Sequence, residues 1–111
     1  MSFYDKGHLF LTIEESDTED GILMALRGEL RSHVNHHIQD ELDAFTTIGK
    51  KVAIDFKEVT GITYSVLTAF LNSQQLVDSL RKGEICLKRI PDAVYQEMDK
   101  WNIIEMLLIE D

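Results

Sequence analysis

The sequence is poor in cysteine, proline and basic side chains, and these shortages exclude several classes of protein. A single cysteine, Cys86, cannot form an internal disulfide, so we expect a reducing, cytoplasmic location. The formal net charge of -9 argues against nucleic acid or an anionic membrane surface as the main partner. Apolar runs fall short of the roughly 20 residues that span a bilayer, and the start, MSFYDKGHLF, lacks the pattern of a signal peptide.

Motifs that carry catalysis or hold a cofactor are also missing. There is no G-x-G-x-x-G turn, no P-loop and no Cys–His–Asp arrangement. His33 and His37 lie one helical turn apart with His36 between them, but zinc generally takes three or four ligands, and His8 is remote in sequence. We therefore expect no metal, no other cofactor and no enzymatic activity.

What the sequence does contain is a regular succession of strand and helix patterns. Its length of 111 residues and its apolar content of 44% suit one domain over residues 1–111, without linkers or repeats. The predicted elements are strands at 8–15 and 22–30 joined by a turn at 16–21, a helix from 32 or 35 to about 49, a strand at 51–56, a helix at 65–82, a strand at 85–90, a helix opened by Pro91, and a strand at 106–109. Gly28 marks a bend or bulge in the second strand.

Strands linked by helices imply crossover connections and a largely parallel sheet with helices packed on it. The prediction is an α/β domain of order β-β-α-β-α-β-α-β, with three main helices and a mixed, mostly parallel sheet of five strands. Apolar residues at strand and helix spacing predict its core. The residues expected to be largely buried are Val52, Ile54, Phe70, Val77, Val94 and Trp101, and Cys86 is expected to be buried as a small hydrophobic residue.

Three hydroxyl side chains in a row, Thr63, Tyr64 and Ser65, stand where a strand pattern gives way to a helix pattern. Ser65 directly precedes the apolar helical run and is predicted to be the N-cap, a contribution of about 1 kcal/mol. The start of a helix after a parallel strand is exposed and favours anions, so a phosphate would be tolerated there. The run therefore has two readings: a helix cap alone, or a cap that also presents a surface to a partner.

Three segments together resemble the STAS domain family, the fold of anti-sigma factor antagonists and of the cytoplasmic tails of sulfate transporters. LRGEL at 26–30 is similar to the family's strand ending in G-E-L. KVAIDFKEVTGITYSVLTAFL at 51–71 is similar to its core strand, D-S-S-G-L loop and helix. MDKWNIIEMLLIED at 98–111 is similar to its last helix and final strand. The resemblance covers nearly the whole chain and implies a single STAS-like domain.

In this register Ser65 falls on the second serine of D-S-S-G, which a partner kinase phosphorylates in the antagonist branch. Thr63 stands where the family has aspartate, Tyr64 replaces the first serine, and Val66 replaces the glycine. The resemblance thus implies a bacterial, cytoplasmic phosphoprotein of the partner-switching kind. It would bind an anti-sigma factor kinase through Thr63, Tyr64, Ser65 and Val66, and phosphorylation of Ser65, with Thr63 as the alternative acceptor, would control that binding.

A second function remains open at this point. The chain would then be a phosphorylation-independent STAS scaffold, or a subunit of a stressosome-like or transport complex. The replacements at Thr63 and Val66 favour this alternative, whereas the presence of Ser65 favours the antagonist. In either case we expect a protein partner, without nucleic acid binding or membrane insertion, and the sequence does not decide between a monomer and a homodimer.

Overall fold

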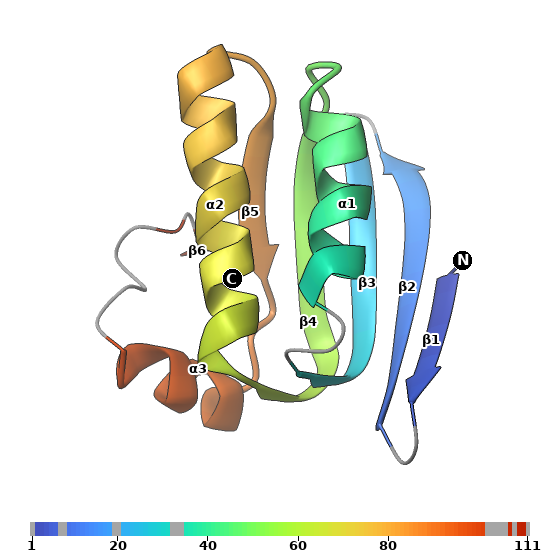
Figure 1. Ribbon diagram of the computed structural model, residues 1–111, viewed down its shortest axis with the longest axis vertical. Coiled ribbons are helices and arrows are strands. Elements are labelled where there is room, and N and C mark those ends of the chain that lie inside the picture. The colour runs from blue at the N-terminus through green and yellow to red at the C-terminus, as the bar shows by residue number, and fades with distance from the viewer. Residues whose placement is uncertain are drawn as a thin grey trace.

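Strands and helices alternate along most of the chain, as Figure 1 shows. The computed structural model describes residues 2–6, 9–18, 21–31, 35–101, 107 and 109–110. The strands in this part of the chain are β1 (Ser2–Lys6), β2 (Leu9–Thr18), β3 (Gly21–Leu30), β4 (Lys51–Ile62), β5 (Glu84–Lys88) and β6 (Ile109–Glu110). The helices are α1 (Asn35–Thr46), α2 (Tyr64–Leu80) and α3 (Asp92–Asp99).

The strands form one mixed sheet whose order follows the chain, from β1 to β6. The pairings β1–β2 and β2–β3 are antiparallel, and β3–β4, β4–β5 and β5–β6 are parallel. The predicted α/β class, with a mixed sheet and three helices, is confirmed for the described residues. The predicted five, mostly parallel strands are not confirmed, since the sheet described here has six. The additional strand, β1, is a five-residue edge strand that was not predicted.

The opening hairpin is tighter than predicted. β2 continues through Ser16 and Asp17, and its last residue, Thr18, pairs with Gly21. The expected turn at 16–21 was therefore too long, because exposed polar side chains at a strand end resemble a turn in the sequence. Gly21 (φ 154°) also brings β3 close to β4: a Cβ atom there would lie 2.1 Å from the carbonyl oxygen of Lys51. Only glycine fits such an approach.

Helices α1 and α2 lie against one face of the sheet (Figure 1), and the core lies between them and the strands. Five of the six residues expected in the core are buried, namely Val52, Ile54, Phe70, Val77 and Val94. Trp101 is partly buried, because it follows the end of α3 and packs against the rim of the core. Cys86 is buried, as predicted.

β4 runs six residues beyond its predicted end at Phe56, because its pairing with β3 continues to Ile62, through two bulges. Ala25 pairs with Asp55 but Arg27 pairs with Glu58, and a second shift follows between Gly28 and Glu29, where the positive φ of Gly28 (110°) agrees with the predicted bulge. Each shift gives β4 one residue more than β3.

The bulges change which side chains of β4 face the helices. Phe56, Val59 and Ile62 are buried with 0%, 3% and 8% of their surface exposed. These buried positions recur every third residue instead of every second. The alternation expected of a strand is therefore absent from the sequence of 56–62, and only the part before Phe56 could be predicted as strand.

Candidate functional site

The carboxyl ends of β3 and β4 meet the beginnings of α2 and α3 at one edge of the sheet, at the bottom of Figure 1. Ligands and partners of open α/β sheets generally meet this edge. A cleft of about 380 Å³ opens here. It is lined by Glu29, Leu30, Arg31, Thr60, Gly61, Ile62, Thr63, Ala93, Val94 and Glu97. Its buried lining residues, Leu30, Ile62 and Val94, are apolar, whereas the partly or fully exposed residues at its rim are mostly polar or charged.

Thr63, not Ser65, is the N-cap of α2, so the predicted cap was wrong by two residues. Thr63 has extended backbone angles (φ -108°, ψ 161°), and its carbonyl oxygen accepts the first helical hydrogen bond, from Leu67 N at 3.1 Å. Its side chain makes no capping hydrogen bond. The Thr63 N–H donates to the carbonyl oxygen of Leu30 at 3.0 Å, and its hydroxyl lies 3.4 Å from the same oxygen. Thr63 therefore ties the start of α2 to the end of β3.

Ser65 lies in the first turn of α2 and is partly exposed. Its Oγ atom lies 3.3 Å from Thr63 Oγ1, and either hydroxyl can be the donor. The carbonyl oxygen of Ser65 accepts a hydrogen bond from Thr68 Oγ1 at 2.7 Å. The Ser65 side chain is thus at the surface, next to a second hydroxyl at the positive end of a helix.

Of the other two predicted partner-binding residues, one faces solvent and one faces the core. Tyr64 has 51% of its surface exposed, and its ring meets that of Trp101 edge-on, with 5.6 Å between centroids and an interplanar angle of 70°. Val66 is fully buried. The structure therefore groups Thr63, Tyr64 and Ser65 at the surface, while Val66 anchors the first turn of α2 below them.

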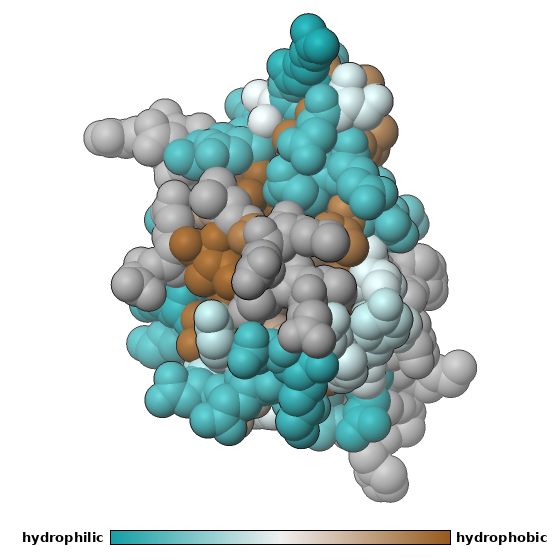
Figure 2. Space-filling model, turned by 90° about the vertical axis from the view of Figure 1, so that its left-hand side faces the viewer, coloured by the Kyte–Doolittle hydropathy of each residue, from teal (hydrophilic) through white to brown (hydrophobic). Residues whose placement is uncertain are grey.

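Figure 2 views the side of the molecule that carries α2 and α3. Most of the described surface on this side is hydrophilic, with a hydrophobic patch at mid-height. The charged groups near the cleft form surface ion pairs, Glu29 with Arg31 and Glu97 with Lys100, each at 2.9 Å. Such exposed pairs contribute little to stability. The polar rim therefore suits a surface that binds and releases a partner.

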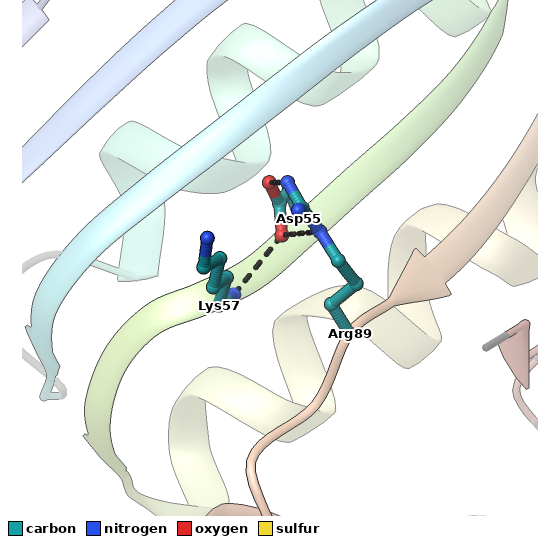
Figure 3. Close-up of polar contacts among 3 residues, drawn as sticks. All are labelled: Asp55, Lys57 and Arg89. Atoms are coloured by element: carbon teal, nitrogen blue, oxygen red, sulfur yellow. Dashed lines mark hydrogen bonds and ion pairs between the residues drawn. The ribbon is translucent and has the colours of Figure 1, made fainter.

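An ion pair that no sequence pattern had indicated, between a buried carboxylate and a half-exposed guanidinium, joins β4 to the segment before α3. The carboxylate of Asp55, of which 8% is exposed, pairs with the guanidinium of Arg89 through Nε (3.1 Å) and Nη2. The same carboxylate accepts the backbone N–H of Lys57 at 3.0 Å, at the first bulge of β4. Figure 3 shows these three residues on the face of the sheet opposite the helices.

Arg89 combines this ion pair with an unusual backbone conformation. Arg89 has φ 53°, which is rare for a residue other than glycine, and Pro91, the N-cap of α3, follows two residues later. The hydrogen bonds that Arg89 donates to Asp55, the negative charge of Asp55 and the charge of Glu58 raise the pKa of Arg89 above its ordinary value. A carboxylate inside the apolar run VAIDF was the one sequence signal for this site, because a buried charge needs a partner.

A second perturbed carboxylate lies on β2. Burial, a hydrogen bond to Glu41 and the negative charge of Glu41 raise the pKa of Glu15 from 4.5 to about 7. Glu41 belongs to α1, so the two carboxylates meet where the hairpin is covered by a helix. Two neighbouring carboxylates share a proton more readily than they ionise together.

The histidines give no metal centre within the described ranges. His33 and His8 lie outside them, and His37 is partly buried at the start of α1. No group of three histidine, cysteine or carboxylate side chains among the described residues could hold a metal ion. The expectation of metal independence remains a prediction.

Comparison with known proteins identifies the family. A model of the STAS domain matches residues 11–111. The chain belongs to the STAS domain family. No curated protein matches the chain. No described helix is both apolar enough and long enough to cross a membrane.

Several solved structures share the STAS fold. An anti-sigma factor antagonist from Mycobacterium paratuberculosis has a TM-score of 0.77 and 10% identity, and the match covers 89% of this chain and 84% of that one. The protein TM1081 of Thermotoga maritima gives 0.76 and 16%, with 97% and 85% covered. The anti-sigma factor antagonist SpoIIAA, a Bacillus cell fate determinant, gives 0.71 and 12% in its unphosphorylated form, with 90% and 89% covered. Identities this low establish the fold alone.

Proposed function

We propose that this STAS domain is a cytoplasmic regulatory module without catalytic activity, which binds a protein partner at the edge formed by the β4–α2 junction. Thr63, Tyr64 and Ser65 contact the partner, and phosphorylation of Ser65 controls binding. The partner is an anti-sigma factor kinase, and one domain spanning the chain carries the function. The supporting observation is the position of Ser65, which is partly exposed in the first turn of α2 beside the exposed Tyr64.

Physical chemistry makes this position suitable for a switch. A phosphate on Ser65 adds almost two negative charges at the positive end of a helix dipole, so the domain itself tolerates it. A partner that covers Tyr64 would meet those charges directly. SpoIIAA, which has the same fold, occurs in a phosphorylated and an unphosphorylated form. Proteins of this fold thus include one that accepts such a modification.

The test is phosphorylation by a candidate kinase with ATP, followed by mass spectrometry and a binding assay. We expect one phosphate, on Ser65, and its loss in Ser65→Ala with binding retained. Ser65→Asp should weaken binding by about 1–3 kcal/mol, since the partner would bury a new charge. Ser79→Asp, on an exposed residue at the far end of α2, is the matched control and should bind normally.

A phosphorylation-independent scaffold is the second candidate. Tyr64 favours it, because exposed aromatic rings are frequent anchors of constitutive interfaces. Normal binding by Ser65→Asp, together with unphosphorylated protein recovered from cells, would support the scaffold and contradict the switch. Phosphate on Thr63 would instead move the switch by two residues. Sedimentation of the pure chain would show whether the partner includes a second copy.

A further inference from the structure

The hydroxyl of Thr63 has two acceptors within reach, and neither holds it firmly. Its distance to the Leu30 carbonyl oxygen is 3.4 Å, and its distance to Ser65 Oγ is 3.3 Å. Both exceed the 2.5–3.0 Å of an ordinary O–H···O hydrogen bond. The Leu30 oxygen already accepts the backbone N–H of Thr63 at 3.0 Å. That oxygen therefore stays satisfied if the Thr63 hydroxyl turns away.

The Thr63 side chain is also not engaged in capping α2. A threonine N-cap normally points its oxygen at the N–H groups of the first turn, where it acts as an acceptor. Here the oxygen lies toward β3 and Ser65 instead. The hydroxyl proton is thus available as a donor next to the oxygen that the proposed function phosphorylates.

We propose that Thr63 is the residue that accommodates a phosphate on Ser65, by turning its hydroxyl from the Leu30 carbonyl to a phosphate oxygen. The proposal rests on the proposed function for the identity of the modified residue. A phosphate oxygen extends beyond Ser65 Oγ, which is already 3.3 Å from Thr63 Oγ1. Hydrogen bonds to charged oxygens are short and about twice as strong as neutral ones, so the phosphate is the better acceptor.

The residue type at position 63 decides whether the charged phosphate on Ser65 is stabilised or repelled. An ionised aspartate, which stands at this position in the family pattern, has no proton to donate and would repel the phosphate. Threonine donates one and carries no charge. The dianionic form of a phosphate on Ser65 should therefore be more stable in this chain than in a chain with a carboxylate at position 63.

The experiment uses the full chain with phosphoserine installed at position 65 during synthesis, so that no kinase is needed. Phosphorus NMR then measures the second pKa of the phosphate in the parent chain, Thr63→Ser, Thr63→Val and Thr63→Asp. A donor stabilises the dianion and lowers this pKa. We expect the parent and Thr63→Ser to titrate about half a unit below Thr63→Val, with Thr63→Asp highest.

A second measurement follows the Leu30 carbonyl carbon by NMR in the parent chain, with and without the phosphate. Its resonance should shift when the hydroxyl leaves, and should move far less in Thr63→Val, which has no hydroxyl. Equal phosphate pKa values in the parent and Thr63→Val, or an unchanged Leu30 signal in the parent, would overturn the proposal. Failure to find a kinase for Ser65 would count against the proposed function and leave these results unaffected.

Discussion

Two strand-to-helix junctions lie at the same edge of the sheet and are held in opposite ways. Between β4 and α2, Thr63 makes hydroxyl contacts of 3.3 and 3.4 Å, and an aromatic ring faces solvent. Between β5 and α3, the buried Asp55 pairs with Arg89, whose backbone is left-handed, and the ring of Pro91 fixes φ at the N-cap of α3. Neither N-cap side chain makes a capping hydrogen bond.

The difference shows how one edge of the sheet combines a fixed junction, before α3, with a junction whose surface can change, before α2. The second junction positions α3, whose residues Ala93, Val94 and Glu97 form one wall of the cleft. The first junction presents Ser65 with contacts that are easily exchanged. A modification at the first junction can therefore alter the surface without moving the wall opposite. Variants that weaken the contacts of the second junction, or that fix those of the first, should change how the two junctions share these roles.

The largest effect is expected from Asp55→Ala, which breaks the second junction. It leaves the Lys57 N–H without its acceptor and Arg89 without its counter-ion. We expect the free energy of unfolding to fall by about 2–4 kcal/mol in urea denaturation, less than for a fully buried pair because Arg89 can reach water. Asp55→Asn should lose less, since its amide oxygen can still accept from Lys57. Asp78→Ala, on the exposed side of α2, should change stability by under about 0.5 kcal/mol. A similar small loss in Asp55→Ala would contradict the rigid junction.

A smaller, pH-dependent effect is expected from Glu15→Gln, which lies outside both junctions. The folded-state pKa of Glu15 is raised, so the folded chain retains a proton that the unfolded chain releases. Stability should therefore fall as the pH rises from about 5 to about 8, by about 1–2 kcal/mol after allowing for partial exposure of Glu15. Glu15→Gln should flatten this dependence, whereas the exposed Glu58→Gln should leave it unchanged. If the stability of Glu15→Gln still falls as the pH rises, the titrating group is a residue other than Glu15.

The smallest effect is expected from two variants of Arg89, which distinguish the contribution of its backbone conformation to stability from that of its ion pair. Arg89→Gly and Arg89→Ala both leave Asp55 without its partner, but only glycine adopts a φ of 53° without strain. We expect the alanine variant to unfold about 1 kcal/mol more easily than the glycine variant. Equal denaturation midpoints would show that the left-handed conformation relaxes once the ion pair is gone.

The elements with regular periodicity were predictable from the sequence. The helix predicted at 65–82 was found at Tyr64–Leu80, and the apolar spacing identified most of the core. Gly28 marked the place of one irregularity in β3, but the extra residues of β4 were not predictable, because they depend on pairing with β3. The pair of Asp55 and Arg89 was missed for a similar reason: the two residues are 34 positions apart, and no local pattern links them.

The candidate site was predictable as a location but not in its geometry. The sequence indicated that Thr63, Tyr64 and Ser65 lie where a strand meets a helix. It did not show which hydroxyl precedes the helix, because either could begin the same apolar periodicity. The burial of Val66 and the contact of Tyr64 with Trp101 depend on packing in three dimensions.

The parallel pairings of β4 also bear on the order in which the protein folds. The hairpin of β2 and β3 joins neighbouring segments, whereas β4 pairs with β3 across α1 and with β5 across α2. Closing these longer loops loses more chain entropy before any contact is gained, so β4 should dock late. On the ribosome, the β4–α2 junction would then acquire its final shape only after β5 has left the exit tunnel. A partner would meet a binding-competent surface only after β5 has been synthesised and has paired with β4.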